Sequence, residues 1–279
     1  MLQGAYREFH QRILEVLPAR RVFSDPLSTL AYGTDASCYR LTPKIVIKTE
    51  HEDEVRAILR EAASLQLPVT FRAAGTSLSG QAVSDSILVV ASHGWKGLQV
   101  LDDGAAIRLQ PGVIGAEANA ALLPYGRKIG PDPATINSAM IGGIVNNNSS
   151  GMCCGTAENS YQTLKSLRLL LADGTLLDSG DAASVAAFRV SHAGLLAQLA
   201  ALRQRVLDDA DLAAKIRRKY KMKNTTGYSL NALLDFADPL EMLTHLLVGS
   251  EGTLAFVSEV TYHSVVEHPH KASALVFYD

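Results

Sequence analysis

A loop of small residues is the first feature of the sequence that suggests chemistry. It reads AAGTSLSGQ over residues 73–81 and lies between the short apolar runs 69–71 and 87–90. Glycine, alanine and serine let backbone N–H groups approach an anion closely, so the loop suits a phosphate. No Gly-Lys-Ser/Thr follows it and no Gly-x-Gly-x-x-Gly occurs in the chain, which excludes a Walker A loop and a Rossmann fingerprint. An ordinary surface turn is the alternative.

A second candidate segment, GPDPATINSAMIGGIVNNNSSG, spans residues 130–151. Pro131 and Pro133 fix the backbone around Asp132. The glycine pair and the asparagine run are unfavourable in a helix, a strand or a core. They suit a place where backbone approaches a polar planar ligand, because Asn and Ser offer hydrogen bonds without charge. A flexible loop is the alternative, although Ile141 and Ile144 are too apolar for a mobile tip.

Two later segments could complete a site. GSEGTLAFVSEVTY (249–262) places a Gly-x-x-Gly turn around Glu251 directly before a strand. KIRRKYKMKNTTGYSL (215–230) is a dense basic run followed by Asn-Thr-Thr-Gly-Tyr. Such a run attracts anionic ligands, but a solvated helix end is the commoner explanation for charge runs.

The elements around these segments predict an α+β protein. Residues 44–48 read as a strand, and Thr49 and Glu52 have the spacing of a capping box for a helix through Gln66. The remaining periodic segments predict strands at 69–71, 87–90 and 252–262, hairpins at 97–112 and 167–180, and helices at 114–123 and 182–216. Apolar residues at helical spacing predict a further helix before Pro18.

Composition narrows the functional classes. The chain has 279 residues, 47% of them hydrophobic and 19% charged, and a net charge of −2. These values predict a globular protein without the basic field of a nucleic-acid binder. No apolar run approaches the roughly 20 residues of a spanning helix. The three cysteines form no disulfide framework or CxxC motif, so we expect a cytoplasmic protein. Pro269 separates His268 from His270, which puts the two histidines on no regular face, so we expect no metal site.

Taken in order, the four segments resemble the flavin-binding domain of the vanillyl-alcohol oxidase/p-cresol methylhydroxylase superfamily. The resemblance is strongest to the branch of D-lactate, glycolate and D-2-hydroxyglutarate dehydrogenases, in particular its long members fused to an iron–sulfur region. It covers roughly Leu41 to His268. It implies an FAD-binding domain of two subdomains, with mixed sheets flanked by helices. It also implies an enzyme that oxidises a D-2-hydroxy acid by hydride transfer to flavin.

The family motifs imply which residues contact FAD. They match the sequence at Arg72, Ala74, Gly75, Thr76, Ser77, Leu78, Ser79, Gly80, Pro131, Asp132, Pro133, Ser138, Ile141, Gly142, Gly143, Asn146, Asn148, Gly151, Gly249, Glu251 and Gly252. The same resemblance places Asn224 and Tyr228 near the flavin or the substrate, and the basic run offers Lys223 as the residue that attracts the substrate carboxylate.

Two departures from the family pattern bear on the cofactor. Family members often have three consecutive glycines in the first loop, whereas Ala73 and Ala74 precede Gly75 here. Members that link FAD covalently carry a histidine after the glycines, where this sequence has Thr76. We therefore expect a non-covalent flavin.

The resemblance also divides the chain. Residues 1–40 are expected to form a helical lead-in, residues 41–268 the FAD-binding domain, and residues 269–279 the start of a truncated substrate or cap domain. ALVFYD (274–279) reads as the first strand of that cap. The catalytic residues are unknown, and the group that accepts the substrate's proton and any iron–sulfur cluster are expected beyond Asp279. The hydroxy acid and the electron acceptor stay open.

Two other functions stay open at this point. A flavin reductase of the UDP-N-acetylmuramate dehydrogenase type would use the same scaffold, although that enzyme lacks elements like GSEGTL and NTxGY. A non-catalytic module that binds FAD or a nucleotide is the second alternative. Flavin absorption of the purified protein and its response to hydroxy acids would separate these functions.

Overall fold

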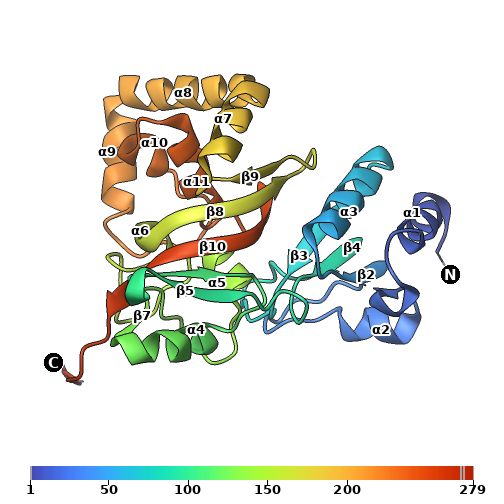
Figure 1. Ribbon diagram of the computed structural model, residues 1–279, viewed down its shortest axis with the longest axis horizontal. Coiled ribbons are helices and arrows are strands. Elements are labelled where there is room, and N and C mark those ends of the chain that lie inside the picture. The colour runs from blue at the N-terminus through green and yellow to red at the C-terminus, as the bar shows by residue number, and fades with distance from the viewer. Residues whose placement is uncertain (1, 271, 273, 279) are drawn as a thin grey trace.

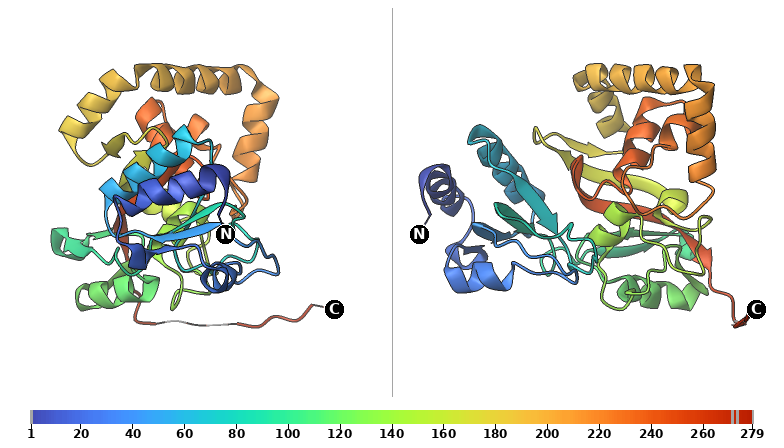
Figure 2. Two further views of the ribbon diagram at one scale, coloured as in Figure 1. Left: turned by 90° about the vertical axis from the view of Figure 1, so that its right-hand side faces the viewer. Right: turned by 180° about the vertical axis from the view of Figure 1, so that it is seen from behind.

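Two β-sheets with helices on their outer sides form the chain, an α+β arrangement (Figure 1). The computed structural model describes residues 2–270, 272 and 274–278. The predicted fold class, mixed sheets flanked by helices, is confirmed. The N-terminal sheet and its helices lie on one side of the molecule, and the second sheet with most of the helices lies on the other (Figures 1 and 2).

The first sheet is four-stranded with the order β1-β2-β4-β3. Its strands are β1 (Val22–Phe23), β2 (Ile45–Lys48), β3 (Val69–Arg72) and β4 (Ile87–Val90). β4 pairs in parallel with both β2 and β3, while β1 pairs antiparallel with β2. Helix α3 (Glu52–Ser64) connects β2 to β3, as parallel strands require a crossover. All three strands that the sequence predicts here are confirmed.

The N-terminal segment is packed into this sheet. It contains α1 (Gly4–Leu14), the short turn η1 (Ala19–Arg21), β1 and α2 (Pro26–Ala31). Phe9 and Ile13 of α1 are fully buried in one cluster with Ile45, Ile58 and Ile87. The segment predicted as a helical lead-in, residues 1–40, therefore adds strand β1 to the first sheet and packs one face of helix α1 against it. Residue 1 lies outside the described part.

The second sheet is antiparallel and built around one long strand. β10 (Ala255–Val266) pairs with β6 (Ala106–Leu109), β7 (Arg127–Ile129) and β8 (Leu164–Leu171). β5 (Leu98–Leu101) pairs with β6 and β9 (Leu176–Asp178) with β8, so both predicted hairpins are confirmed. The short turn η2 (Asp102–Gly104) connects β5 to β6.

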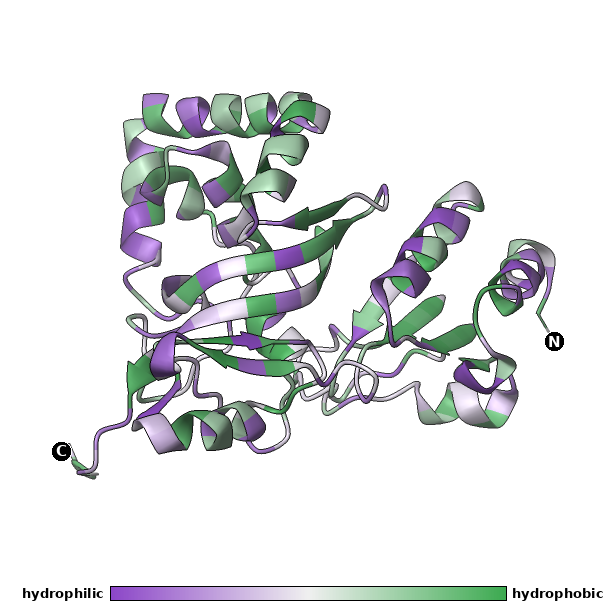
Figure 3. Cartoon of the chain, viewed as in Figure 1, coloured by the Kyte–Doolittle hydropathy of each residue, from purple (hydrophilic) through white to green (hydrophobic). Residues whose placement is uncertain are grey.

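Helices lie around this sheet, as Figures 2 and 3 show. The core cluster contains buried residues of β6, β8 and β10 together with the apolar sides of the helices. These helices are α4 (Gly115–Leu122) with the turn η3 (Leu123–Tyr125), α5 (Ile141–Asn147), α6 (Ser160–Thr163), α7 (Ala182–Ser191), α8 (Ala193–Asp208), α9 (Ala210–Lys219), α10 (Ala232–Asp235) and α11 (Pro239–Leu247).

The predicted capping box is wrong, although the helix it introduces exists. The N-cap of α3 is His51, without a side-chain cap. The Thr49 hydroxyl instead accepts a hydrogen bond from Trp95 Nε1 at 3.2 Å. The Glu52 carboxylate accepts hydrogen bonds from Arg168 of the other sheet. Tertiary partners outcompete the local cap in both cases.

The stretch IGGIVNN forms a helix, contrary to its composition. α5 spans Ile141–Asn147 and ends with Asn148 in the left-handed conformation, at a φ of 54°. Ile141, Ile144 and Val145 are buried in the core of the second sheet. Burial of these three side chains offsets the weak helix propensity of the glycine pair, so packing decides the conformation.

The C-terminal segment shows no strand in its described part. Residues 274–278 are exposed and form no regular element, and residues 271, 273 and 279 of the predicted cap segment lie outside the described residues. Among the described helices none alone is long and apolar enough to cross a membrane. α7 and α8 together meet that length and composition, but they are bent by 84°.

The two sheets meet at an apolar junction backed by an ion pair. Phe256 of β10 contacts Phe71 of β3 and Trp95, with ring centroids 4.9 and 5.3 Å apart. Next to these rings, Arg168 of β8 donates to both carboxylate oxygens of Glu52, at 2.7 and 2.9 Å. Burial raises the pKa of Glu52, but hydrogen bonds from Arg168 and Ser258 outweigh it and hold this pKa below its ordinary value.

Glu52→Gln should destabilise the protein in a pH-dependent way. A carboxyl whose pKa is lower in the folded state stabilises the fold above its unfolded pKa, and this contribution disappears as the pH falls through the folded pKa. We expect a loss of about 1–2 kcal/mol in the free energy of unfolding at pH 7, measured by urea titration, that shrinks below pH 4. The exposed Asp211→Asn serves as the control. An equal loss in the free energy of unfolding at pH 7 and below pH 4 would contradict the role of the ion pair.

Candidate functional site

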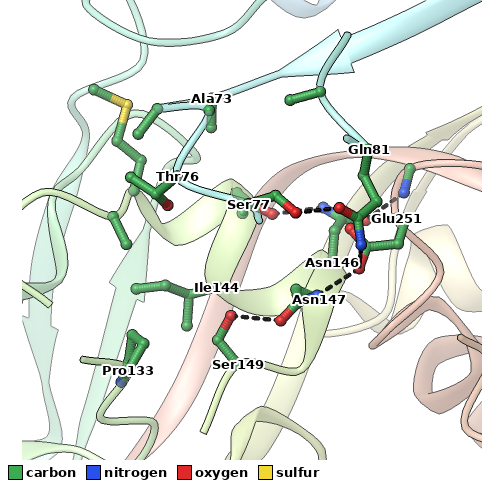
Figure 4. A pocket seen from close by; sticks show the side chains of 18 of the residues that line it. Ala73, Thr76, Ser77, Gln81, Pro133, Ile144, Asn146, Asn147, Ser149 and Glu251 are labelled. Carbon is green, nitrogen blue, oxygen red and sulfur yellow. Dashed lines mark hydrogen bonds between the residues drawn. The ribbon is translucent and has the colours of Figure 1, made fainter. Parts of the chain in front are cut away.

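A cavity of about 640 Å³ lies where the two sheets meet. Its walls come from the loop after β3, from the segment that leads into α5 and α5 itself, and from the turn before β10 (Figure 4). It is lined by residues 36, 71–79, 81, 82, 91, 111, 133–135, 138–140, 142–144, 146, 147, 149, 150, 223, 225, 226, 251, 252 and 255–257.

The first wall is the loop AAGTSLS, residues 73–79. Gly75 has a φ of 70°, and a Cβ added to it would lie 2.7 Å from the guanidinium of Arg72. The loop therefore needs a glycine here, both for its conformation and for the close approach of Arg72. Ala73 and Ala74 both line the cavity, so the departure from three glycines leaves the wall in place.

Arg72 is the cation of this wall. It ends β3, its Nη1 donates to the backbone oxygen of Tyr32 at 3.2 Å, and burial lowers its pKa below the ordinary value. A half-buried guanidinium with a single neutral partner has most of its donors available for an anion.

The second wall is helix α5. Gly143 lines the cavity, and a Cβ added to it would meet no atom within 4 Å. Gly142 also lines the cavity, but its added Cβ would lie 2.8 Å from Pro111 Cβ. Asn146 donates to the Gly142 oxygen at 2.8 Å and accepts from Gly252 N–H at 3.2 Å. Its side chain therefore connects the helix to the turn before β10.

Glu251 connects the three walls (Figure 4). Asn147 Nδ2 donates to its Oε1 at 2.6 Å and Gln81 Nε2 to the same oxygen at 3.4 Å. Gln81 in turn accepts a hydrogen bond from Ser77 of the first loop. The backbone of Glu251 has a φ of 54°, and its N–H donates to the backbone oxygen of Asn146 at 2.8 Å. Burial raises the pKa of the Glu251 carboxyl, against the hydrogen bond from Asn147.

Several residues predicted to contact the cofactor do not line the cavity. Asp132 and Gly151 belong to a structural loop, because the Asp132 carboxylate accepts the N–H groups of Gly151, Cys153 and Cys154 at 2.7–3.3 Å. A Cβ at Gly151 would lie 2.0 Å from the backbone oxygen of Asp132. Pro131, which precedes this loop, is also absent from the cavity wall.

The other residues of this kind lie outside the cavity wall for local reasons. Ile141 points into the core, and Asn148 caps α5 while its Oδ1 accepts from Tyr161 N–H at 3.2 Å. Gly80 and Gly249 do not line the cavity and adopt positive φ values of 77° and 90°. These residues shape the backbone that carries the site without facing the cavity.

The substrate-side predictions are divided in the same way. Lys223 lines the cavity, together with Thr225 of the Asn-Thr-x-Gly-Tyr element and the adjacent Thr226. Asn224 and Tyr228 do not line it. Asn224 accepts a hydrogen bond from Thr226 at 3.1 Å, and the Tyr228 hydroxyl pairs with Thr253 at 2.8 Å, so both stabilise the surrounding loops.

The sequence also missed Gln81, Asn147, Phe71 and Phe256, all of which line the cavity. The first three lie next to a residue that was named, and Phe256 lies in the strand predicted after the glycine turn. Helical spacing would have identified Asn147, because it lies four residues after Gly143 on the same face. The described residues contain no group of three or more His, Cys, Asp or Glu side chains that could hold a metal ion.

The match to a family model decides the class of this site. Residues 43–180 match the model described as "FAD binding domain". Residues 43–180 form an FAD-binding domain. The part of the chain it covers contains the first sheet from β2 onward, the loop of Arg72 and helix α5, which supply most of the cavity wall.

Similar proteins agree with this assignment. The chain is 31% identical over 262 residues to a D-2-hydroxyglutarate dehydrogenase of Pantoea ananatis, covering 88% of this chain and 25% of that protein. It is 30% identical over 169 residues to the glycolate oxidase subunit GlcD of Escherichia coli, covering 60% of this chain and 34% of the subunit. The chain thus spans about a quarter to a third of these relatives.

A solved structure shares the fold. The structure of an alkyldihydroxyacetonephosphate synthase superimposes with a TM-score of 0.61 over 94% of this chain and 41% of that one, at 15% identity. At this identity the likeness shows the fold alone.

The cavity of the FAD-binding domain suits its cofactor chemically. Apolar side chains such as Phe71 and Phe256 offer a surface for an aromatic ring system, and Asn, Gln, Ser and Thr side chains surround it with uncharged hydrogen-bonding groups. Among the described residues two cations, Arg72 and Lys223, and one acid, Glu251, line the cavity. The excess of cations favours an anionic ligand, and the apolar side chains favour one that carries a planar ring.

Gly143→Leu should abolish FAD binding and leave the fold intact. The new side chain would extend into the cavity, since no atom lies within 4 Å of the added Cβ, and leucine is the better helix former. We expect at least a tenfold loss of FAD affinity in a fluorescence titration with no drop in Tm. Gly142 is a poorer test than the sequence suggests, because a side chain there collides with Pro111.

Gly194→Leu is the matched control for Gly143→Leu. It also lies in a helix, α8, and its added Cβ also meets no atom within 4 Å, but it does not line the cavity. Its FAD affinity should equal that of the wild type. If both leucine variants bind FAD alike, α5 is not a wall of the cofactor site.

Glu251→Gln should stabilise the protein at neutral pH. A buried acid with a raised pKa favours the protonated form in the folded state, so its ionisation costs stability as the pH rises through the folded pKa. Glutamine is neutral and keeps the acceptor for Asn147. We expect a gain of roughly 0.5–1 kcal/mol at pH 7 and none near pH 3.5 in urea titrations. Exposed Glu15→Gln is the control, and a less stable Glu251→Gln at pH 7 would refute this reasoning.

Proposed function

We propose that this chain is the FAD-holding part of an enzyme that oxidises a D-2-hydroxy acid, such as D-2-hydroxyglutarate, glycolate or D-lactate, to the 2-oxo acid. The names of the similar proteins support the substrate class. The observation that carries the proposal is the cavity between the two sheets, whose walls coincide with the motifs of the flavin family. The whole enzyme extends beyond this chain in the relatives, where we place the proton-accepting group and any iron–sulfur cluster.

The residues of the cavity divide the work of holding FAD. Arg72 and the N–H groups of the loop at residues 73–79 would offset the charge of the diphosphate. Phe71 and Phe256 would pack against the isoalloxazine and exclude water, and Asn147 would face its polar edge. FAD, when bound, supplies the hydride acceptor for the oxidation. Thr76 occupies the position of the linking histidine, so the attachment is non-covalent.

Lys223 is the residue we propose for the substrate carboxylate. It lines the cavity at the end of a basic run in which Arg217, Arg218, Lys219 and Lys221 are exposed. A cluster of exposed cations beside a cavity raises the local concentration of anionic ligands. Asn224 and Tyr228 would support Lys223 by ordering the loop that carries it.

The cysteines bear on the compartment in which the protein works. All three are free thiols, two of them adjacent, and this favours the reducing cytoplasm.

The direct test is the colour of the purified chain. Bound FAD should give absorption bands near those of oxidised flavin, and denaturation followed by filtration should release all of it as free FAD, which shows non-covalent binding. Protein that is colourless and gives no fluorescence change on titration with FAD would contradict the proposal. Flavin that stays with the denatured chain would contradict the non-covalent attachment only.

The substrate is tested on the full-length protein. The FAD-loaded enzyme is mixed under anaerobic conditions with D-2-hydroxyglutarate, glycolate or D-lactate. Bleaching of the flavin absorption band identifies the substrate. Lys223→Met should raise KM for that acid at least tenfold with a smaller change in kcat, whereas Lys221→Met should behave as the wild type. Bleaching by NADPH and not by any hydroxy acid would favour a flavin reductase instead.

A further inference from the structure

A carboxylate outside the cavity has a buried oxygen without a hydrogen-bond partner. Asp35 lies in the loop between α2 and β2, where its Oδ1 accepts the N–H of Ser37 at 2.8 Å. Its Oδ2 is buried and has no hydrogen-bond partner. A buried carboxylate oxygen without a donor is costly, so such a group in a folded protein calls for an explanation.

The loop that carries Asp35 is held in place. Leu41 N–H donates to the Gly33 oxygen at 3.1 Å, and Thr34 and Arg40 form an isolated β-bridge, so the loop is closed at its base. At its tip, Ala36 N–H donates to the Gly75 oxygen at 3.0 Å. Asp35 is therefore fixed directly against the first wall of the cavity.

Arg72 is the cation on which the charge of this carboxylate acts. Its guanidinium is packed against Gly75, and its Nη1 donates to the Tyr32 oxygen at 3.2 Å, three residues before Asp35. The charge of Asp35 acts on Arg72 and opposes the lowering of its pKa by burial. Within the described residues neither side chain forms an ion pair within 4.0 Å, so each has capacity left.

The positions of the two side chains assign their roles. Arg72 lines the cavity and Asp35 does not, although the adjacent Ala36 does. The Asp35 carboxylate thus acts on the guanidinium from outside the cavity, as second partners of ligand-binding side chains commonly do. We propose that Asp35 is a positioning residue that orients the Arg72 guanidinium toward the diphosphate of FAD.

This inference rests on the proposed FAD binding, and its effect should be confined to the charged part of the cofactor. Arg72 contacts the diphosphate in this account, so Asp35 acts on the diphosphate only through Arg72. Riboflavin has the same isoalloxazine ring and no phosphate. A change in Asp35 should therefore alter the affinity for FAD and leave that for riboflavin unchanged.

The test is a double-mutant cycle on the chain freed of flavin, with FAD titrated by fluorescence. Asp35→Asn keeps the shape and removes the charge, and we expect it to weaken FAD binding roughly fivefold to tenfold. In the Arg72→Gln background Asp35→Asn should have no further effect. Asp85→Asn, an exposed change before β4, is the control and should bind FAD as the wild type does.

The outcomes separate this inference from the proposed function. Wild-type protein that does not bind FAD refutes the proposed function. If the wild type binds FAD, the role of Asp35 is refuted when Asp35→Asn binds FAD as tightly or more tightly. It is also refuted when the loss is the same in the Arg72→Gln background, or when riboflavin affinity falls equally, because both indicate a general structural effect.

Discussion

The packing of Phe256 between the two sheets is the interaction on which the site depends. Its ring lies against Phe71 and Trp95, in one cluster with Val55 of α3 and Leu170 of β8. The loop after β3 belongs to one sheet and α5 to the other, so they face each other only while this junction holds. The ion pair between Glu52 and Arg168 adds a directional contact beside it, and directional contacts fix relative orientation better than apolar packing does.

The cavity is built from residues that weaken local structure. Gly142 and Gly143 lower the helix propensity of α5, and Glu251 occupies a left-handed conformation uncommon for its side chain. Each of these costs is offset by tertiary contacts: buried Ile141, Ile144 and Val145 hold the helix, and Asn146 and Asn147 hold the turn. Open space for a ligand requires small side chains on one face, and the opposite face supplies the stability.

Much of the framework could be predicted from the sequence, because it is governed by local periodicity. The parallel strands of the first sheet read as short apolar runs, and the hairpin at residues 167–180 is marked by Asp173-Gly174 at its turn. The features that the local sequence pattern does not predict are determined by contacts with residues distant in the chain. The capping box at Thr49 and Glu52 is replaced by Trp95 and Arg168, and the helix at residues 141–147 exists because of its buried face.

The site was predictable at the level of segments and less so for individual side chains. The loop at residues 73–79 and the glycine pair line the cavity as the family motifs suggested. Asp132 and Asn148 belong to the same motifs, yet their polar atoms satisfy backbone N–H groups. A motif records that a residue matters, while only the structure separates ligand contact from backbone support. Asp35 could not be found from the sequence, since its relation to Arg72 depends on how two loops pack.

A crystal structure of the chain grown with FAD will decide whether FAD occupies the cavity between the sheets. We expect electron density for the diphosphate beside Arg72 and the loop at residues 73–79, with the isoalloxazine between that loop and α5. FAD density at another place on the protein, or a cavity without flavin density in crystals that contain stoichiometric FAD, would show that this cavity is not the FAD site.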